Sequence, residues 1–86
     1  MSHPPLAAAE CRAARALLRW TISRLAEAAQ VAETTISFFE QERRQPMRAN
    51  ALRIRQVLED AGVIFLDDEG EAGGPGVRLR GGTSSS

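Results

Sequence analysis

The sequence predicts a mainly α-helical fold, in which four helices are followed by a short β-hairpin. Three observations lead to this prediction. Between positions 6 and 61, apolar residues recur at helical spacing in four segments separated by polar or turn-forming residues. Between residues 29 and 32 the helical period breaks and resumes in a new phase, which favours two short helices meeting at an angle. After Gly62 the pattern changes to two short runs of strand-forming residues, 63–66 and 77–80.

Composition restricts the chain to a few classes of protein. Its 86 residues allow one small domain, and a hydrophobic content of 43% is enough to build a core. A single cysteine excludes an intramolecular disulfide and favours a reducing compartment. Because His3 and that cysteine have no metal-ligating neighbours, we expect no metal and no cofactor. No apolar run approaches the ~20 residues of a membrane span, so we expect a cytoplasmic protein with no membrane partner.

Charge is unevenly distributed, although the formal net charge is zero. Residues 1–58 carry nine Arg and five Glu, a balance of +4, whereas residues 59–86 carry two Arg and six acids, a balance of −4. All eleven basic residues are Arg, whose planar guanidinium binds phosphates and base edges through two hydrogen bonds. A GC-rich genome would produce the same bias, so the charge pattern permits nucleic-acid binding without requiring it.

The first helix is expected from Leu6 to about Arg19, after a Pro4-Pro5 pair that prevents an earlier start. Cys11 falls on its apolar face and is interpreted as a small core residue, not as a nucleophile. Trp20, which follows the helix, is interpreted as a core anchor. The predicted buried face contains Ala7, Cys11, Ala14 and Leu18, with Leu17 beside them.

The second and third helices carry the most informative pattern. Thr21 is expected to cap a helix from Ile22 to about Ala29, and a third helix is expected from Glu33 to about Glu42. At 100° per residue the third helix has an apolar back and a mostly polar front, which suits a helix that presents its front to a ligand. We therefore interpret the two as a helix-turn-helix, with the third as the recognition helix. The back consists of Ala32, Thr35, Ile36 and Phe39, and the front of Glu33, Thr34, Ser37, Phe38 and Gln41.

A fourth helix is expected over residues 51–61, with Asn50 as its N-cap and Gly62 just past its end. Its predicted buried face is Ala51, Ile54, Val57, Leu58 and Ala61, whereas Leu52 falls on the opposite side. The first strand, residues 63–66, is apolar on both faces, so one face can cover the helices while the other remains available to a partner. The predicted organisation is a helix-turn-helix domain over residues 6–62, a hairpin over 63–80, and flexible ends at 1–5 and 81–86.

With these residues in place, the chain resembles the Cro/C1-type (XRE) helix-turn-helix family of bacterial DNA-binding transcriptional regulators. The matching residues run from about Glu10 to Leu66. Short members of the family are similar in their last segments, here Gly62–Leu66 and Gly74–Arg80. The core signature is Leu25-Ala26, Val31, Thr35-Ile36-Ser37, Phe39-Glu40, Arg43-Arg44 and Pro46.

The resemblance implies a lambda-repressor-like fold and a sequence-specific, repressor-like regulator that binds a palindromic operator on double-stranded DNA as a homodimer. It also implies that Arg15 and Glu40 form a structural pair between the first and third helices. The residues implied to read bases are Glu33, Thr34, Ser37 and Phe38. Those implied to contact phosphate are Thr21, Ser23, Arg24, Arg43, Arg44 and Arg48.

Four positions depart from the family pattern. Ile22 replaces a Gln, and Ala32 replaces the Ser or Thr that usually caps the recognition helix. Gln30 and Glu42 replace glycines, and at Gln30 the turn requires a positive φ that costs a non-glycine residue up to ~1 kcal/mol. None of these four departures breaks the fold, because the core residues are retained.

Dimerisation is expected because one such module offers only about 600–1,000 Å² of contact with DNA. The free face of the first strand suggests where the second copy would bind. The predicted dimer surface consists of Leu52, Val63, Ile64, Phe65, Leu66, Val77 and Leu79.

A second interpretation belongs to a different class. In this interpretation the helix-turn-helix scaffold is a protein-interaction module that binds a partner chain, antitoxin-like or co-regulator. The zero net charge, the acidic C-terminal third, Glu33 and an exposed Phe38 favour it. An enzyme is not expected, because Ser23 and Ser37 have no base and the acidic run 67–69 lacks metal-ligand spacing. No ligand-sensing domain is present, so we expect no small-molecule effector.

Overall fold

The computed structural model describes residues 5–66 and 76–80, and it has the predicted order of elements. The helices are α1 (Ala8–Leu18), α2 (Ile22–Ala29), α3 (Glu33–Glu40) and α4 (Arg48–Asp60). The strands β1 (Val63–Leu66) and β2 (Gly76–Leu79) form an antiparallel hairpin. The mainly helical fold with a short C-terminal hairpin is therefore confirmed. Apart from Pro5, the ends predicted to be flexible lie outside the described residues, as does the hairpin loop 67–75.

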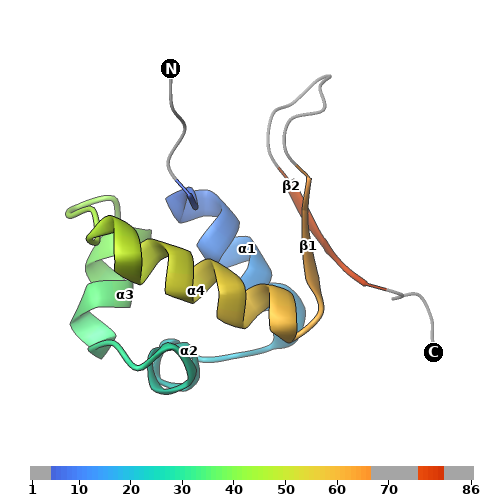
Figure 1. Ribbon diagram of the computed structural model, residues 1–86, viewed down its shortest axis with the longest axis horizontal. Coiled ribbons are helices and arrows are strands. Elements are labelled where there is room, and N and C mark those ends of the chain that lie inside the picture. Colours follow the sequence, from blue (N-terminus) through green and yellow to red (C-terminus); the bar gives the residue numbers. More distant parts are fainter. Residues whose placement is uncertain (1–4, 67–75, 81–86) are drawn as a thin grey trace.

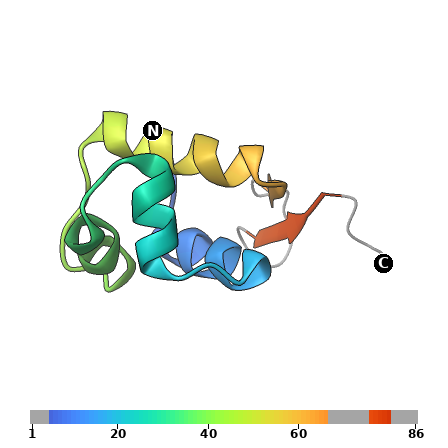
Figure 2. The same ribbon diagram turned by 90° about the horizontal axis from the view of Figure 1, so that it is seen from below.

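Helix α3 and the hairpin lie at opposite ends of the molecule. Figure 1 shows α3 at one end, the hairpin at the other, and α1 and α4 between them. Figures 1 and 2 together show α2 and α3 crossing at a steep angle, as in a helix-turn-helix. The strands contact α1 and α4. Among the helices that the structure describes, none is long and apolar enough to span a membrane.

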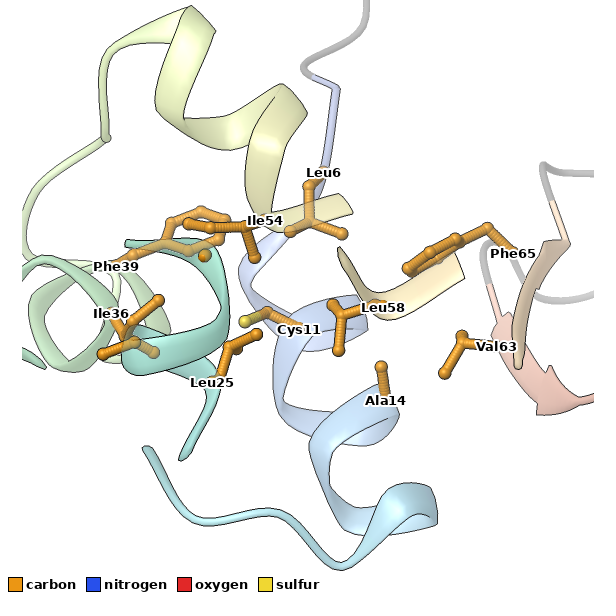
Figure 3. Close-up of a cluster of buried hydrophobic side chains, with 12 residues drawn as sticks. Leu6, Cys11, Ala14, Leu25, Ile36, Phe39, Ile54, Leu58, Val63 and Phe65 are labelled. Atoms are coloured by element: carbon orange, nitrogen blue, oxygen red, sulfur yellow. The ribbon is translucent and has the colours of Figure 1, made fainter. Parts of the chain in front are cut away.

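One hydrophobic core joins the helices to the hairpin (Figure 3). Leu25 of α2, Phe39 of α3 and Leu58 of α4 are almost completely buried in it. Val63 and Phe65 of β1 belong to the same core. The hairpin is therefore packed on the helices through its own side chains and does not depend on a partner to bury them.

The helix starts follow local hydrogen bonding. Thr21 Oγ1 accepts a hydrogen bond of 2.9 Å from the backbone N–H of Arg24, which confirms Thr21 as the N-cap of α2. Helix α1 begins at Ala8, two residues later than expected, because the Ala7 N–H donates to the Glu10 carboxylate at 2.9 Å. Leu6 lies outside the helix but is buried.

Two sequence predictions about the helices are wrong. Asn50 is not the N-cap of α4, because the helix begins at Arg48 after an extended Met47. Arg48 and Ala49 are strong helix formers, so the helix extends back towards Pro46 and places Asn50 in its first turn. Leu17 is exposed, since it lies roughly 90° from the centre of the stripe that α1 buries.

Helices α1, α2 and α3 end in the same type of turn, which contains two backbone hydrogen bonds. In the first, an N–H donates to the carbonyl three residues earlier; in the second, the N–H of the next residue donates to the carbonyl five residues before it. The donor of the first bond has a left-handed backbone in each turn, with φ of 60–61°; these residues are Arg19, Gln30 and Glu42. Glycine is the usual residue there, so each position costs the fold about 1 kcal/mol. The positive φ expected at Gln30 is confirmed, and α3 ends at Glu40, two residues before the expected boundary. The longer bonds are Trp20 N–H to Arg15 C=O, Val31 N–H to Ala26 C=O and Arg43 N–H to Phe38 C=O.

The register of the hairpin separates its two faces. Val63 pairs with Leu79 and Phe65 with Val77, and these four side chains pack on the core. Residues 64, 66 and 78 alternate with them and lie on the outer face. The second strand is shifted one residue towards the N-terminus from the predicted range 77–80. The Arg80 N–H donates to the Gly62 carbonyl at 2.6 Å and closes the open end of the hairpin.

Candidate nucleic-acid interface

The exposed face of α3 is the candidate reading surface. Glu33 and Thr34 are exposed in its first turn, and Phe38 is 36% exposed one turn further on. Ser37 is half-buried, and its Oγ accepts a hydrogen bond of 2.8 Å from Gln41 Nε2. The hydroxyl hydrogen of Ser37 remains available to donate. The four residues predicted to read bases therefore lie on a helix whose opposite side is packed in the core.

A buried carboxylate fixes the C-terminal end of α3 against α1. Arg15 Nε donates to Glu40 Oε2 at 2.9 Å and Arg15 Nη2 donates to Glu40 Oε1 at 2.7 Å, so the ion pair is bidentate. Arg15 Nη1 also donates to the Trp20 carbonyl at 2.9 Å. This is the pair that the family resemblance implied.

Two further side chains of α1 complete this network. The Cys11 thiol donates to Glu40 Oε2 at 3.1 Å, and the Arg12 guanidinium donates to the Glu40 backbone carbonyl. Burial raises the pKa of the Cys11 thiol strongly, and its hydrogen bond to Glu40 raises it further, so the thiol stays protonated. The hydrogen bond to Glu40 also raises the pKa of Arg15. A satisfied buried network of this kind holds α3 in one orientation on the domain.

The segment after α3 turns back along the exposed face of that helix. The guanidinium carbon of Arg43 lies 5.6 Å from the centroid of the Phe38 ring. Arg44 and Phe38 line an open hollow of about 250 Å³ between α3 and the start of α4. The structure thus brings Thr34, Phe38, Arg43 and Arg44 together. The hollow is lined by Thr34, Thr35, Phe38, Arg44, Gln45, Pro46, Met47 and Asn50.

Three residues predicted to contact phosphate lie at the start of α2, away from the hollow: Thr21, Ser23 and Arg24. The Thr21 hydroxyl oxygen is already used as the helix cap, but its hydrogen remains free to donate. Ser23 is exposed. Arg24 is also exposed, and its guanidinium carbon lies 4.8 Å from the centroid of the half-buried Trp20 ring. The interpretation of Trp20 as a core anchor is confirmed in part: the ring packs against the core, but it also contacts the exposed guanidinium of Arg24.

The residues predicted to form the dimer surface differ in exposure. Val63 is 2% exposed and Phe65 is 8% exposed, so the single chain already buries both in its own core. Leu66 is exposed on the outer face of the hairpin, and Ile64 is half-buried there. Leu52 is also exposed, but it lies in the N-terminal half of α4, whereas β1 follows the other end of that helix. Val77 and Leu79 are half-buried and pack on the core.

Sequence reasoning missed Met47 and Asn50 as neighbours of α3. Met47 is 72% exposed at the edge of the hollow, and Asn50 lines it from the first turn of α4. The signal that would have found them is Pro46, because a helix that starts two residues after it places both side chains beside the third helix.

The chain matches no known family of proteins and no curated protein. Within residues 5–66 and 76–80, no group of three or more His, Cys, Asp or Glu residues is placed to hold a metal ion. A functional assignment must therefore be based on the chemistry of the side chains around α3.

Proposed function

We propose that the protein binds double-stranded DNA through α3 and acts as a transcriptional regulator, repressor-like, of the Cro/C1-type (XRE) kind. The observation that carries the proposal is the exposed, mostly polar face of α3 on a steeply crossed helix pair, with Arg43 and Arg44 directly beside it. A helix of this kind fits the major groove, where side chains reach base edges.

The exposed groups suit the two kinds of contact that a DNA-binding protein makes. Glu33 can accept a hydrogen bond from cytosine N4, and Thr34 and Ser37 can donate or accept. Arg24, Arg44 and Arg48 are exposed cations suited to phosphates, which fix position and register without reading sequence. The hydroxyls of Thr21 and Ser23 are suited to the same role at the start of α2.

Salt dependence tests the phosphate contacts. Each cation that neutralises a phosphate adds about 0.9 to the slope of log K against log salt concentration. The double variant Arg44→Gln, Arg48→Gln should therefore lower the magnitude of that slope by about 1.8, measured by fluorescence anisotropy on a selected duplex. Arg78→Gln, an exposed cation on the hairpin at the far end of the molecule from α3, is the matched control and should leave the slope unchanged. An unchanged slope in the double variant would rule out these contacts.

We also propose that the active species is a homodimer on a palindromic site, formed through the outer face of the hairpin. Leu66 and Ile64 supply the apolar surface, and a single module is too small for tight operator binding.

The dimer is tested by sedimentation velocity at micromolar concentrations. Leu66→Arg should convert a dimer to a monomer, because it places a charge in an apolar interface. Leu17→Arg is the matched control: Leu17 is 38% exposed and Leu66 is 40% exposed, but Leu17 belongs to α1. A wild-type chain that remains monomeric at high micromolar concentration would exclude this surface as a dimer interface.

One observation favours a second candidate function, a protein-interaction module of the antitoxin-like or co-regulator kind. Phe38, Pro46 and Met47 are among the residues that line the hollow beside α3, and the large apolar side chains of Phe38 and Met47 are exposed. Failure to bind duplex DNA in a salt-dependent way would favour this function over DNA binding.

A further inference from the structure

The turn that ends α3 fixes Arg43 beside Phe38. The backbone N–H of Arg43 donates to the Phe38 carbonyl at 2.8 Å, and the N–H of Glu42 donates to the Phe39 carbonyl at 2.9 Å. In this type of turn an apolar side chain usually packs on the helix residue to which the chain returns. Here a guanidinium occupies that place, 5.6 Å from the ring centroid. Arg43 is therefore held along the exposed face of α3 by its own backbone and by the aromatic ring.

The Phe38 ring projects between two hollows. One, of about 230 Å³, is lined by Phe38, Arg43 and Arg44, and the other runs towards Pro46 and Met47. A phenyl ring has no hydrogen-bonding group, so it cannot distinguish the polar edges of bases. The apolar group that base pairs present in the major groove is the C5 methyl of thymine, and an apolar contact with it is an established kind of readout.

Arg43 is suited to a neighbouring base pair. Stacking on a ring uses the face of the guanidinium and leaves the N–H groups along its edge free. That edge matches guanine O6 and N7, with which Arg forms two hydrogen bonds. The 5.6 Å separation is larger than the rise of one base pair, about 3.4 Å, and smaller than the rise of two. The guanidinium and the ring are therefore close enough to each other to contact neighbouring base pairs.

We propose that Phe38 and Arg43 read adjacent T·A and G·C base pairs together, Phe38 through the thymine methyl and Arg43 through guanine. Arg43 is then a specificity-determining residue, in contrast to the phosphate contact that the family resemblance implies. The inference rests on the proposed DNA binding and deepens it, since it names the bases that this part of α3 selects.

Base analogues test the two contacts separately. A duplex selected from random DNA is resynthesised with deoxyuridine in place of each thymidine, which removes only the methyl, and affinities are measured by fluorescence anisotropy. One such replacement should weaken wild-type binding about fourfold, the value expected for one buried methyl group. Replacing the adjacent guanine with 7-deazaguanine, which removes N7, should weaken it at least about fivefold.

Protein variants assign each effect to its residue. Phe38→Ala should bind the thymidine and deoxyuridine duplexes equally. Because Phe38 is partly exposed, we expect this variant to fold, and circular dichroism checks that it does. Arg43→Ala removes every donor of the side chain, so it should become insensitive to 7-deazaguanine. Arg44→Ala is the matched control on the neighbouring cation: it should bind DNA more weakly but retain both analogue effects.

Two results would overturn the inference. The first is a wild-type protein whose affinity for the selected duplex is unchanged by deoxyuridine at every thymidine, or by 7-deazaguanine at every guanine. Such a protein does not read adjacent T·A and G·C base pairs in the proposed way. Analogue effects that persist unchanged in Phe38→Ala and Arg43→Ala would assign the reading to other residues. If the selection recovers no duplex at all, the proposed DNA binding itself fails, which is distinguishable from binding without these preferences.

Discussion

Replacing Arg15 with alanine is expected to lower the free energy of unfolding by about 3 kcal/mol. Removing one partner of a buried ion pair costs about 3–5 kcal/mol, because the other charge is left without compensation. Glu40 is 5% exposed and would lose both hydrogen bonds from the guanidinium, at 2.9 and 2.7 Å. The lower end of the range applies because the Arg15 side chain is itself 21% exposed.

Urea denaturation followed by circular dichroism measures this loss. Glu59→Gln is the matched control, because it breaks the Arg55–Glu59 pair, which joins one turn of α4 to the next and is much more exposed. That pair should contribute only about 0.3–0.5 kcal/mol. If Arg15→Ala destabilises the protein no more than Glu59→Gln does, the Arg15–Glu40 pair does not hold α1 to α3.

This network also bears on recognition. Glu40 is the last residue of α3, and the residues proposed to read bases lie on the same short helix. Three side chains of α1 bind Glu40, so the orientation of the exposed face of α3 is set by contacts with α1. In the proposed complex with DNA, a rigid support of this kind would lower the cost of ordering side chains on binding.

Much of the fold could be predicted from the sequence because it depends on periodicity. The alternation of buried and exposed residues in α3 follows from helical spacing, and the exposed position of Leu52 on α4 follows in the same way. The Arg15–Glu40 pair could not be derived from spacing, since its members are 25 residues apart. It was available only through the resemblance to a known family.

The features that could not be predicted depend on tertiary packing or on unusual turn residues. A strand that is apolar on both faces does not reveal which face meets the helices, so the burial of Val63 and Phe65 against the chain's own helices could not be predicted. The approach of Arg43 to Phe38 depends on a left-handed Glu42, which glycine would normally provide. Propensity alone does not predict a non-glycine residue in that conformation.

Stability at alkaline pH gives a second large expected effect, which isolates Cys11. The ordinary pKa of the thiol is 9.0, and burial together with the hydrogen bond to Glu40 raises the pKa in the folded protein. Below pH 9.0 both states carry the proton, so stability does not depend on this group. Above pH 9.0 the unfolded chain loses the proton while the folded chain keeps it, and stability therefore falls as pH rises. The expected slope is about 1.4 kcal/mol per pH unit, or about 2.7 kcal/mol lost by pH 11.

The composition of the chain makes this measurement unusually specific. All eleven basic residues are Arg and the chain has no Tyr, so no other side chain has an ordinary pKa between 9 and 12. Urea denaturation of wild type and Cys11→Ala at intervals from pH 8 to 11 should give a declining curve for the wild type and a flat curve for the variant. A decline of equal slope in Cys11→Ala would show that another process limits stability at high pH. A flat curve in both would mean that the Cys11 thiol ionises in the folded state as readily as in the unfolded chain. The proposed hydrogen bond from this thiol to Glu40 would then be wrong, because a thiolate cannot donate to a carboxylate.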